Sequence, residues 1–156
     1  MDFRYTEDQL SIQSIARDFA QKRIAPVAAD FDRSGEFPLE NIREMGQLGL
    51  MGIEVPDQYG GAGLDPVAYA LAMIEIAAAD CAHSTIMSVN NTLYCNGILK
   101  YGNEAQKQKY VRAIAEGHGI GAYALTEPQS GSDASNMHTR AQKNADGDWV
   151  INGKKS

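Results

Sequence analysis

Apolar residues recur with the period of an α-helix through the first two-thirds of the chain. A capping-box pattern comes first: Thr6 can accept a bond from the amide three residues later, and Gln9 can return one. Five apolar side chains then follow at helical spacing and predict one buried stripe. These residues are Ile12, Ile15, Ala16, Phe19 and Ala20. Pro26 is expected to bend or restart this helix, which continues over residues 27–31.

Glycine and proline mark the next boundaries. The Ser34-Gly35 pair predicts a break, and Pro38 suits the first position of a short helix. Dense Gly and Pro over residues 46–63 indicate an irregular loop. Asp65 and Pro66 then form an N-cap and a first-turn proline. The helix that they open is strongly apolar and is predicted to be buried on most sides through Ala70, Met73, Ile74 and Ala77.

Two more helices complete this pattern. One is predicted over about residues 84–100 and stops near Gly102. A second capping box, in which Asn103 and Gln106 exchange bonds, begins a short helix that ends at Gly117.

The period changes after Gly117. Residues 120–125 predict a strand, and residues 139–143 and 149–152 predict a hairpin around Asp146-Gly147. The fold class is therefore mainly α: a helical-bundle domain over residues 1–118, then the first strands of a β-barrel or sandwich domain over residues 119–156. Asn152-Gly153 is a second turn signal with no returning strand, so we expect that the chain is truncated inside the β-domain.

The composition is that of a soluble globular protein, since 44% of the 156 residues are hydrophobic and 22% are charged. No apolar run approaches the roughly 20 residues of a membrane helix, and we expect no membrane span. The first residues lack the layout of a signal peptide. The net charge of −6 argues against binding of nucleic acid, but backbone N–H groups could still hold an anionic ligand.

No metal site is predicted. Cys81 and Cys95 have no metal-type spacing and are expected to be reduced and buried. His83, His118 and His138 likewise lack a ligand or nucleophile pattern, and we expect them on the surface or in loops.

The main chemical signal is residues 123–133, Tyr-Ala-Leu-Thr-Glu-Pro-Gln-Ser-Gly-Ser-Asp. The segment combines a strand end with hydroxyls, a stiffening proline and glycine amides that a ligand can approach. Such a loop can hydrogen-bond a planar heterocycle and a phosphate. The residues alone favour a plain polar strand and turn over a binding loop.

This segment resembles the flavin-binding signature of the acyl-CoA dehydrogenase family, in which Thr-Glu-Pro is followed by two variable positions and Gly-Ser-Asp. Three further segments are similar to that family in the same order, namely residues 59–63, 102–109 and 149–154. The resemblance implies an N-terminal helical domain, a middle β-domain and a C-terminal four-helix domain, with FAD between the last two. It places the base, a glutamate, beyond residue 156, so no catalytic residue is assigned and the chain alone is expected to be inactive.

The family's cofactor contacts carry over to five residues. Tyr123 and Leu125 are expected to meet the flavin pyrimidine edge through backbone groups, and Thr126 to bond near flavin N5. Gly131 and Ser132 are expected at the FAD phosphates, with Ser132 also near the CoA part of the substrate. The resemblance assigns loop-shaping roles, rather than catalysis, to Glu127 and Asp133.

The substrate is approached through the segment 86–94, which is similar to short-chain (butyryl-CoA) members. Ile86, Val89 and Asn90 are the predicted substrate contacts, although Ile86, Val89 and Leu93 would equally form a core stripe by spacing alone. The implied partners are acyl-CoA and an electron-transfer flavoprotein. The full-length protein, called the parent below, is expected to be a homotetramer or homodimer in the bacterial cytoplasm or, alternatively, the mitochondrial matrix. Two other readings stay open: a non-catalytic helical interaction module, and a relative of acyl-CoA oxidases.

Overall fold

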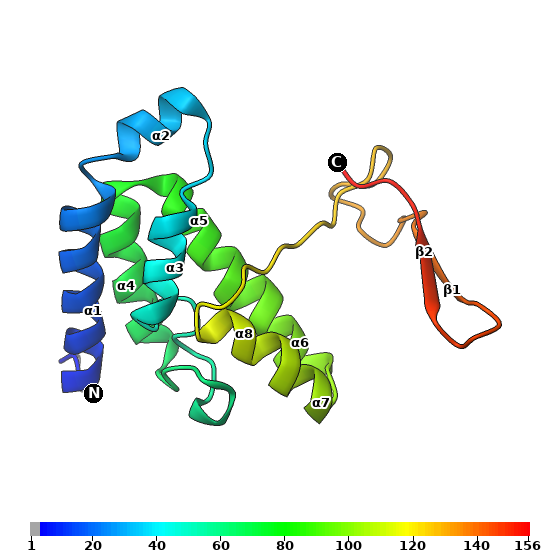
Figure 1. Cartoon of the computed structure of the whole chain (residues 1–156), viewed down its shortest axis with the longest axis horizontal. Helices are drawn as coiled ribbons and strands as arrows, with labels where there is room; N and C mark the ends of the chain where they lie inside the picture. Colours follow the sequence, from blue (N-terminus) through cyan, green and yellow to red (C-terminus); the bar gives the residue numbers. More distant parts are fainter. Residues whose placement is uncertain (1–3) are drawn as a thin grey trace. The chain divides into compact units, whose positions relative to one another are not determined.

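The computed structural model describes residues 4–156 and divides into two compact units, Met1–Ala122 and Tyr123–Ser156. The first unit is helical and the second holds a two-stranded antiparallel sheet (Figure 1). The predicted fold class, mainly helical with a small sheet at the end, is confirmed. The helices are α1 (Glu7–Phe19), η1 (Ala20–Ile24), α2 (Ala28–Ser34), α3 (Leu39–Gln47), η2 (Asp57–Tyr59), α4 (Pro66–Ala79), α5 (Cys81–Ser88), η3 (Val89–Cys95), α6 (Asn96–Tyr101), α7 (Glu104–Gln106), η4 (Lys107–Val111) and α8 (Arg112–Ala115).

Helix α1 begins at the predicted capping box, in which Gln9 N–H donates to Thr6 Oγ1 and Thr6 N–H donates to Gln9 Oε1. Its buried face packs against α4 and contains three of the five predicted stripe residues, and a fourth, Ala20, is buried at the start of η1 (Figure 1). The fifth, Ile15, is 38% exposed, and its predicted burial is wrong. The apolar stripe is therefore wider than the face that α4 covers.

Helix α4 begins as predicted, with Ala68 N–H donating to the Asp65 cap at 2.9 Å. Its predicted burial on most sides is wrong. Ala70 is exposed, Ile74 is 60% exposed, and Met73 and Ala77 are only half-buried. The buried face is instead made by Ala68, Leu71, Ala72 and Ile76. A helix rich in alanine shows little apolar asymmetry in sequence, so its composition did not reveal which face meets α1 and α5.

Residues Cys81–Tyr101 form one uninterrupted helical rod in which a π-helical segment, η3, joins α5 to α6. The predicted helix over 84–100 is confirmed, and it begins three residues earlier because Asp80 accepts the His83 N–H at 3.0 Å. Three successive side chains bond back to carbonyl groups four residues earlier. Asn90 donates to Ile86 O, Asn91 to Met87 O and Thr92 to Ser88 O. These bonds occupy carbonyls where the helix widens.

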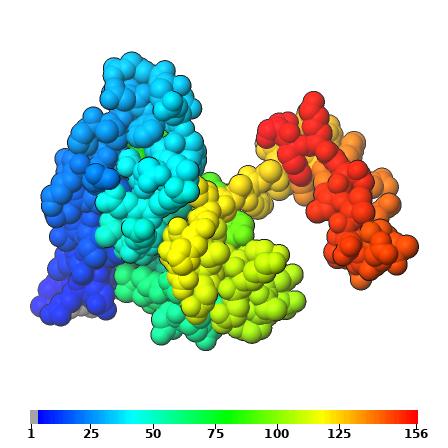
Figure 2. Space-filling view, viewed as in Figure 1, coloured from blue at the N-terminus to red at the C-terminus, as the bar shows by residue number. Residues whose placement is uncertain are grey.

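The last turn of α3 and the Gly-rich loop after it are packed against α8 and the segment that follows α8. A Cβ added to Gly46 would lie 2.3 Å from the Gly117 Cα, so the two backbones touch. In Figure 2 these two parts of the first unit, cyan and yellow, share one continuous surface. Asn91 fixes the same loop from the rod, because it accepts the Ile53 N–H and donates to Leu50 O.

The second unit contains β1 (Arg140–Lys143) and β2 (Trp149–Asn152), paired antiparallel around the predicted turn. The hairpin is thus confirmed. The strand predicted over 120–125 is wrong, since this segment is extended without a partner strand among residues 4–156. One reason is that the Gly121 N–H donates to the Asn90 side chain at 2.7 Å instead of to a neighbouring strand.

The histidines and cysteines differ in burial. His83 is completely buried, so its predicted surface position is wrong, whereas His118 and His138 are exposed. Cys95 is buried as expected, and its burial raises its pKa to about 12. Cys81 is exposed, and its predicted burial is wrong. Across residues 4–156, no helix is both long and apolar enough to cross a membrane.

Candidate functional site

The loop over residues 126–133 is organised around one buried carboxylate. Glu127 is 3% exposed and faces into the second unit. Its Oε2 accepts bonds from His138 N–H at 2.6 Å and from the Gln129 amide at 2.7 Å. Its Oε1 accepts bonds from Thr139 N–H and from Lys155 Nζ, both at 3.0 Å. We refer to Glu127, Gln129, His138, Thr139 and Lys155 as the Glu127 cluster.

These donors hold the carboxylate in its charged form. Hydrogen bonding from Thr139 has the largest effect and lowers the pKa of Glu127. Burial acts in the opposite direction, but the bonds from His138, Lys155 and Gln129 lower the pKa further, to far below its ordinary value. Glu127 is therefore committed to structure within the loop, which agrees with the loop-shaping role that the family resemblance implied for it.

Backbone bonds complete the turn. Glu127 N–H donates to Ser130 O at 2.9 Å, and Ser130 N–H returns a bond to Glu127 O at 3.0 Å. Ser130 Oγ, itself buried, donates to Asp133 O. The two ends of the loop are thus tied together below its surface.

The five predicted cofactor residues, in this loop and just before it, are exposed. Tyr123 is 52% exposed and Leu125 is 37% exposed, and Thr126 and Ser132 are also exposed. A Cβ added to Gly131 would meet no atom within 4 Å, so the backbone there is accessible.

The chemical groups of these five residues are of the types that bind FAD. An aromatic and an aliphatic side chain can cover a flat ring, and hydroxyl and amide groups can bond its polar edge and a phosphate. The loop's buried carboxylate, which would repel a phosphate, is turned inward and paired with Lys155. No acceptor among residues 4–156 takes the Thr126 N–H, which leaves this donor available for a ligand.

The three predicted substrate residues belong to the first unit, on α5 and η3. Ile86 and Val89 are half-buried, and Asn90 is 1% exposed. Both polar ends of the Asn90 amide are occupied within the protein: Nδ2 donates to Ile86 O, and Oδ1 accepts the Gly121 N–H. The geometry gives Asn90 an anchoring role in the chain segment that leaves the helices.

A polar triad next to Ile86, made of a buried asparagine, a buried histidine and a half-buried aspartate, was missed by sequence reasoning. The Asn41 amide lies 3.1 Å from His83 Nε2, and His83 Nδ1 lies 2.5 Å from Asp80 Oδ2. An amide N–H can only donate, so Nε2 accepts and Nδ1 carries the proton that is shared with Asp80. Burial tends to raise the pKa of Asp80, but the His83 bonds outweigh it and lower this pKa. The available signal was Asp80 as a helix cap three residues before His83.

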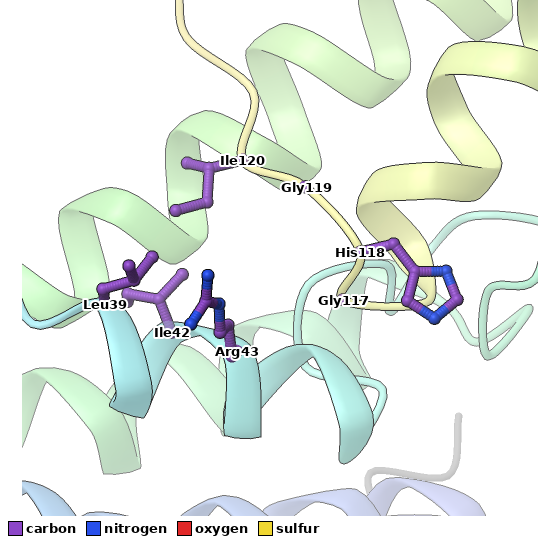
Figure 3. Close-up of a pocket in the computed structure, with 7 residues that line it drawn as sticks. All are labelled: Leu39, Ile42, Arg43, Gly117, His118, Gly119 and Ile120. Atoms are coloured by element: carbon purple, nitrogen blue, oxygen red, sulfur yellow. The ribbon is translucent and has the colours of Figure 1, made fainter.

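A recess in the first unit lies between α3 and the segment after α8. It measures about 220 Å³. Figure 3 shows Leu39, Ile42 and Arg43 projecting from α3 toward the strip that carries Gly119 and Ile120. Within residues 4–156 no cluster of His, Cys, Asp or Glu could hold a metal ion.

The chain thus consists of a helical unit followed by a hairpin unit that carries an exposed polar loop. The chain belongs to the acyl-CoA dehydrogenase family. The family model for the acyl-CoA dehydrogenase N-terminal domain matches residues 6–118, and that for the middle domain matches residues 122–156. The predicted family is confirmed.

Individual relatives agree with this assignment. The chain is 48% identical over 150 residues to an acyl-CoA dehydrogenase of Bacillus subtilis, covering 96% of this chain and 39% of that protein. Butyryl-CoA dehydrogenase from Megasphaera elsdenii superposes with a TM-score of 0.93 at 39% identity, covering 99% of this chain and 41% of that chain. A chain from a structure of the electron transferring flavoprotein of Acidaminococcus fermentans gives a TM-score of 0.95 at 41% identity, covering 99% and 40%. The chain thus spans about two-fifths of the length of the relatives that it matches.

Proposed function

We propose that this chain is the N-terminal part of an FAD-dependent acyl-CoA dehydrogenase that removes one hydrogen from each of the α and β carbons of an acyl-CoA. The observation that carries the proposal is the loop over residues 126–133. Its buried Glu127 is paired within the second unit, while the Thr126 and Ser132 hydroxyls and the Gly131 backbone are exposed.

When it is bound, FAD supplies the ring that accepts the hydride. The residues of this chain bind and orient that ring. Tyr123 and Leu125 contact its pyrimidine edge through backbone groups, and Thr126 donates a hydrogen bond near the position that receives the hydride. Gly131 and Ser132 bond the phosphates, where an open backbone lets an anion approach.

The remaining parts of the proposal concern the whole protein. We place the catalytic base, a glutamate, beyond residue 156, because the family resemblance assigns that role to no carboxylate of this chain and Glu127 is buried and paired within its loop. We propose domain limits of 1–118 and 119–156, and an isolated chain without dehydrogenase activity. The parent is a homodimer or homotetramer of the bacterial cytoplasm or mitochondrial matrix.

A short, unbranched acyl group is the proposed substrate, and an electron-transfer flavoprotein is the proposed acceptor. The likeness to butyryl-CoA dehydrogenase supports the former, and the match to a chain from an electron transferring flavoprotein structure supports the latter. Ile86 and Val89 are the proposed acyl contacts in this chain, with Asn90 beside them.

The test has two parts. FAD is titrated into the ¹⁵N-labelled chain, and the amide resonances of Tyr123, Leu125, Thr126, Gly131 and Ser132 are expected to shift while those of the β1–β2 turn stay in place. The full-length parent is assayed with butyryl-CoA and palmitoyl-CoA, and we expect faster flavin reduction with butyryl-CoA. No shift at these amides would contradict the cofactor assignment. Rapid reoxidation of the reduced parent by air would indicate an oxidase instead.

A further inference from the structure

The Leu125 and Thr126 carbonyls, within the segment proposed to touch flavin, are held from behind by the last two residues. Lys155 Nζ donates to Leu125 O at 2.9 Å, and Ser156 N–H donates to Thr126 O at 2.9 Å. Both contacts lie within the second unit. They join residues that are separated by about thirty positions in the chain.

The Lys155 ammonium has no donor to spare. Its three N–H groups are matched by three acceptors: Leu125 O, Glu127 Oε1 at 3.0 Å and Met137 Sδ at 3.4 Å. The partner Glu127 side chain is only 2% exposed, so this ion pair is shielded from water at its acidic end. Removing Lys155 is therefore costly, because it leaves the buried Glu127 carboxylate without its ionic partner.

The bond from Lys155 to the Leu125 carbonyl also fixes the direction of the Thr126 N–H. In a trans peptide the C=O of one residue and the N–H of the next point in opposite directions. The chain has no cis peptide among its described residues, so a Leu125 carbonyl aimed at Lys155 forces the Thr126 N–H to face the other way. That N–H has no acceptor in the described part of the chain.

We propose that Lys155 is a positioning residue for the flavin site: by holding the Leu125 carbonyl and the Glu127 carboxylate together, it aims the free Thr126 N–H at the bound flavin ring. This inference rests on the proposed function. Lys155 itself lies behind the loop and does not touch the ring. Its effect on the cofactor passes through the orientation of a single peptide group.

The neighbouring lysine provides a matched control. Lys154 is exposed and has no hydrogen bond or ion pair in the structure. Lys154→Met and Lys155→Met have the same composition and net charge, so a difference between them reports position alone. Lys155→Arg keeps the positive charge and offers N–H donors on a planar group.

Two quantities are measured on each ¹⁵N-labelled variant of the chain. The first is amide hydrogen exchange at Ser156, His138 and Thr139 without cofactor. The second is the dissociation constant for FAD, followed through the Thr126 amide shift. For Lys155→Met we expect exchange at least tenfold faster, FAD binding at least tenfold weaker and a reduced Thr126 shift. Lys154→Met is expected to match the unsubstituted chain in both.

The outcomes are separable. FAD binding within twofold of the unsubstituted chain, in any folded variant whose Ser156 and Thr139 amides exchange fast, would overturn the positioning role. If Lys155→Met does not fold, Lys155→Arg decides by the same criterion. If the loop amides of the unsubstituted chain do not respond to FAD, the proposed function is overturned. The exchange rates alone would then show whether Lys155 orders the loop.

Discussion

Replacing Asn90 with alanine separates its two assigned roles, contact with substrate and anchoring of the backbone. The Asn90 side chain is 1% exposed, and its Oδ1 accepts the buried Gly121 N–H at 2.7 Å. Alanine removes this acceptor and leaves the N–H without a partner. A buried donor in that condition costs about 1–3 kcal/mol. We expect a loss near 2 kcal/mol, which is roughly a thirtyfold fall in the ratio of folded to unfolded chain.

The assay is urea unfolding followed by far-ultraviolet circular dichroism, which reports the helical first unit. Asn96→Ala is the control, because Asn96 lies on the same rod and its side chain makes no hydrogen bond in the structure. Asn96 is half-buried. A substitution there removes no hydrogen bond, and we expect it to alter stability by about 0.5 kcal/mol or less. If Asn90→Ala were as mild as Asn96→Ala, the anchoring bond would not contribute. Asn90 would then be free to serve the substrate alone.

Three further predictions follow from the structure. Thr126→Ala should weaken FAD binding about ten- to a hundredfold, because the bond from its hydroxyl to the ring is lost although its backbone N–H remains. Thr126→Ser keeps the hydroxyl and should bind as the unsubstituted chain does; titration with FAD checks both. Gly46→Ala should lower the free energy of unfolding, measured in urea, by about 1–3 kcal/mol, because its Cβ would lie 2.3 Å from the Gly117 Cα. Gly97→Ala is the control: its Cβ would meet no atom within 4 Å, so it should raise the free energy of unfolding by about 0.5–1 kcal/mol. The pKa of Glu127 is lowered on folding, so its contribution to stability is present above its unfolded pKa of about 4.3 and is lost as the pH falls toward the folded value. Fluorescence of the single tryptophan, Trp149 in β2, should therefore show that the stability difference between the unsubstituted chain and Glu127→Gln shrinks below about pH 4, and a constant difference would contradict this.

Local signals in the sequence predicted most of the helices and the hairpin. The caps at Thr6, Asp65 and Asn103 each make the predicted bond, because a cap is a contact between residues three positions apart. The Asp146-Gly147 turn succeeded for the same reason: Gly147 has a φ of 87°, which glycine adopts without strain. These features depend on a few neighbouring residues and on no tertiary contact.

The failures are all tertiary. Whether Ile15 or Ile74 is covered depends on which neighbouring helix lies against it, and apolar spacing does not contain that information. Residues 120–125 have the apolar composition of a strand, but Asn90, some thirty positions earlier, takes one of the amides that a strand would use. His83 is polar and looks external in sequence. It is buried because Asp80 and Asn41 occupy both of its ring nitrogens.

The candidate site shows the same division within a single loop. The residues proposed to meet the cofactor stand together between positions 123 and 132, where a contiguous motif can be recognised. The residues that fix their geometry do not: Thr139 is twelve positions from Glu127 and Lys155 is twenty-eight. A ligand-facing group must have a particular chemistry, which the motif records, but its direction is set by bonds on the hidden side of the same peptides. Substitutions at Lys155 can therefore alter flavin binding while the Thr-Glu-Pro signature stays intact, so an intact signature is evidence for the family and not by itself for a working cofactor site.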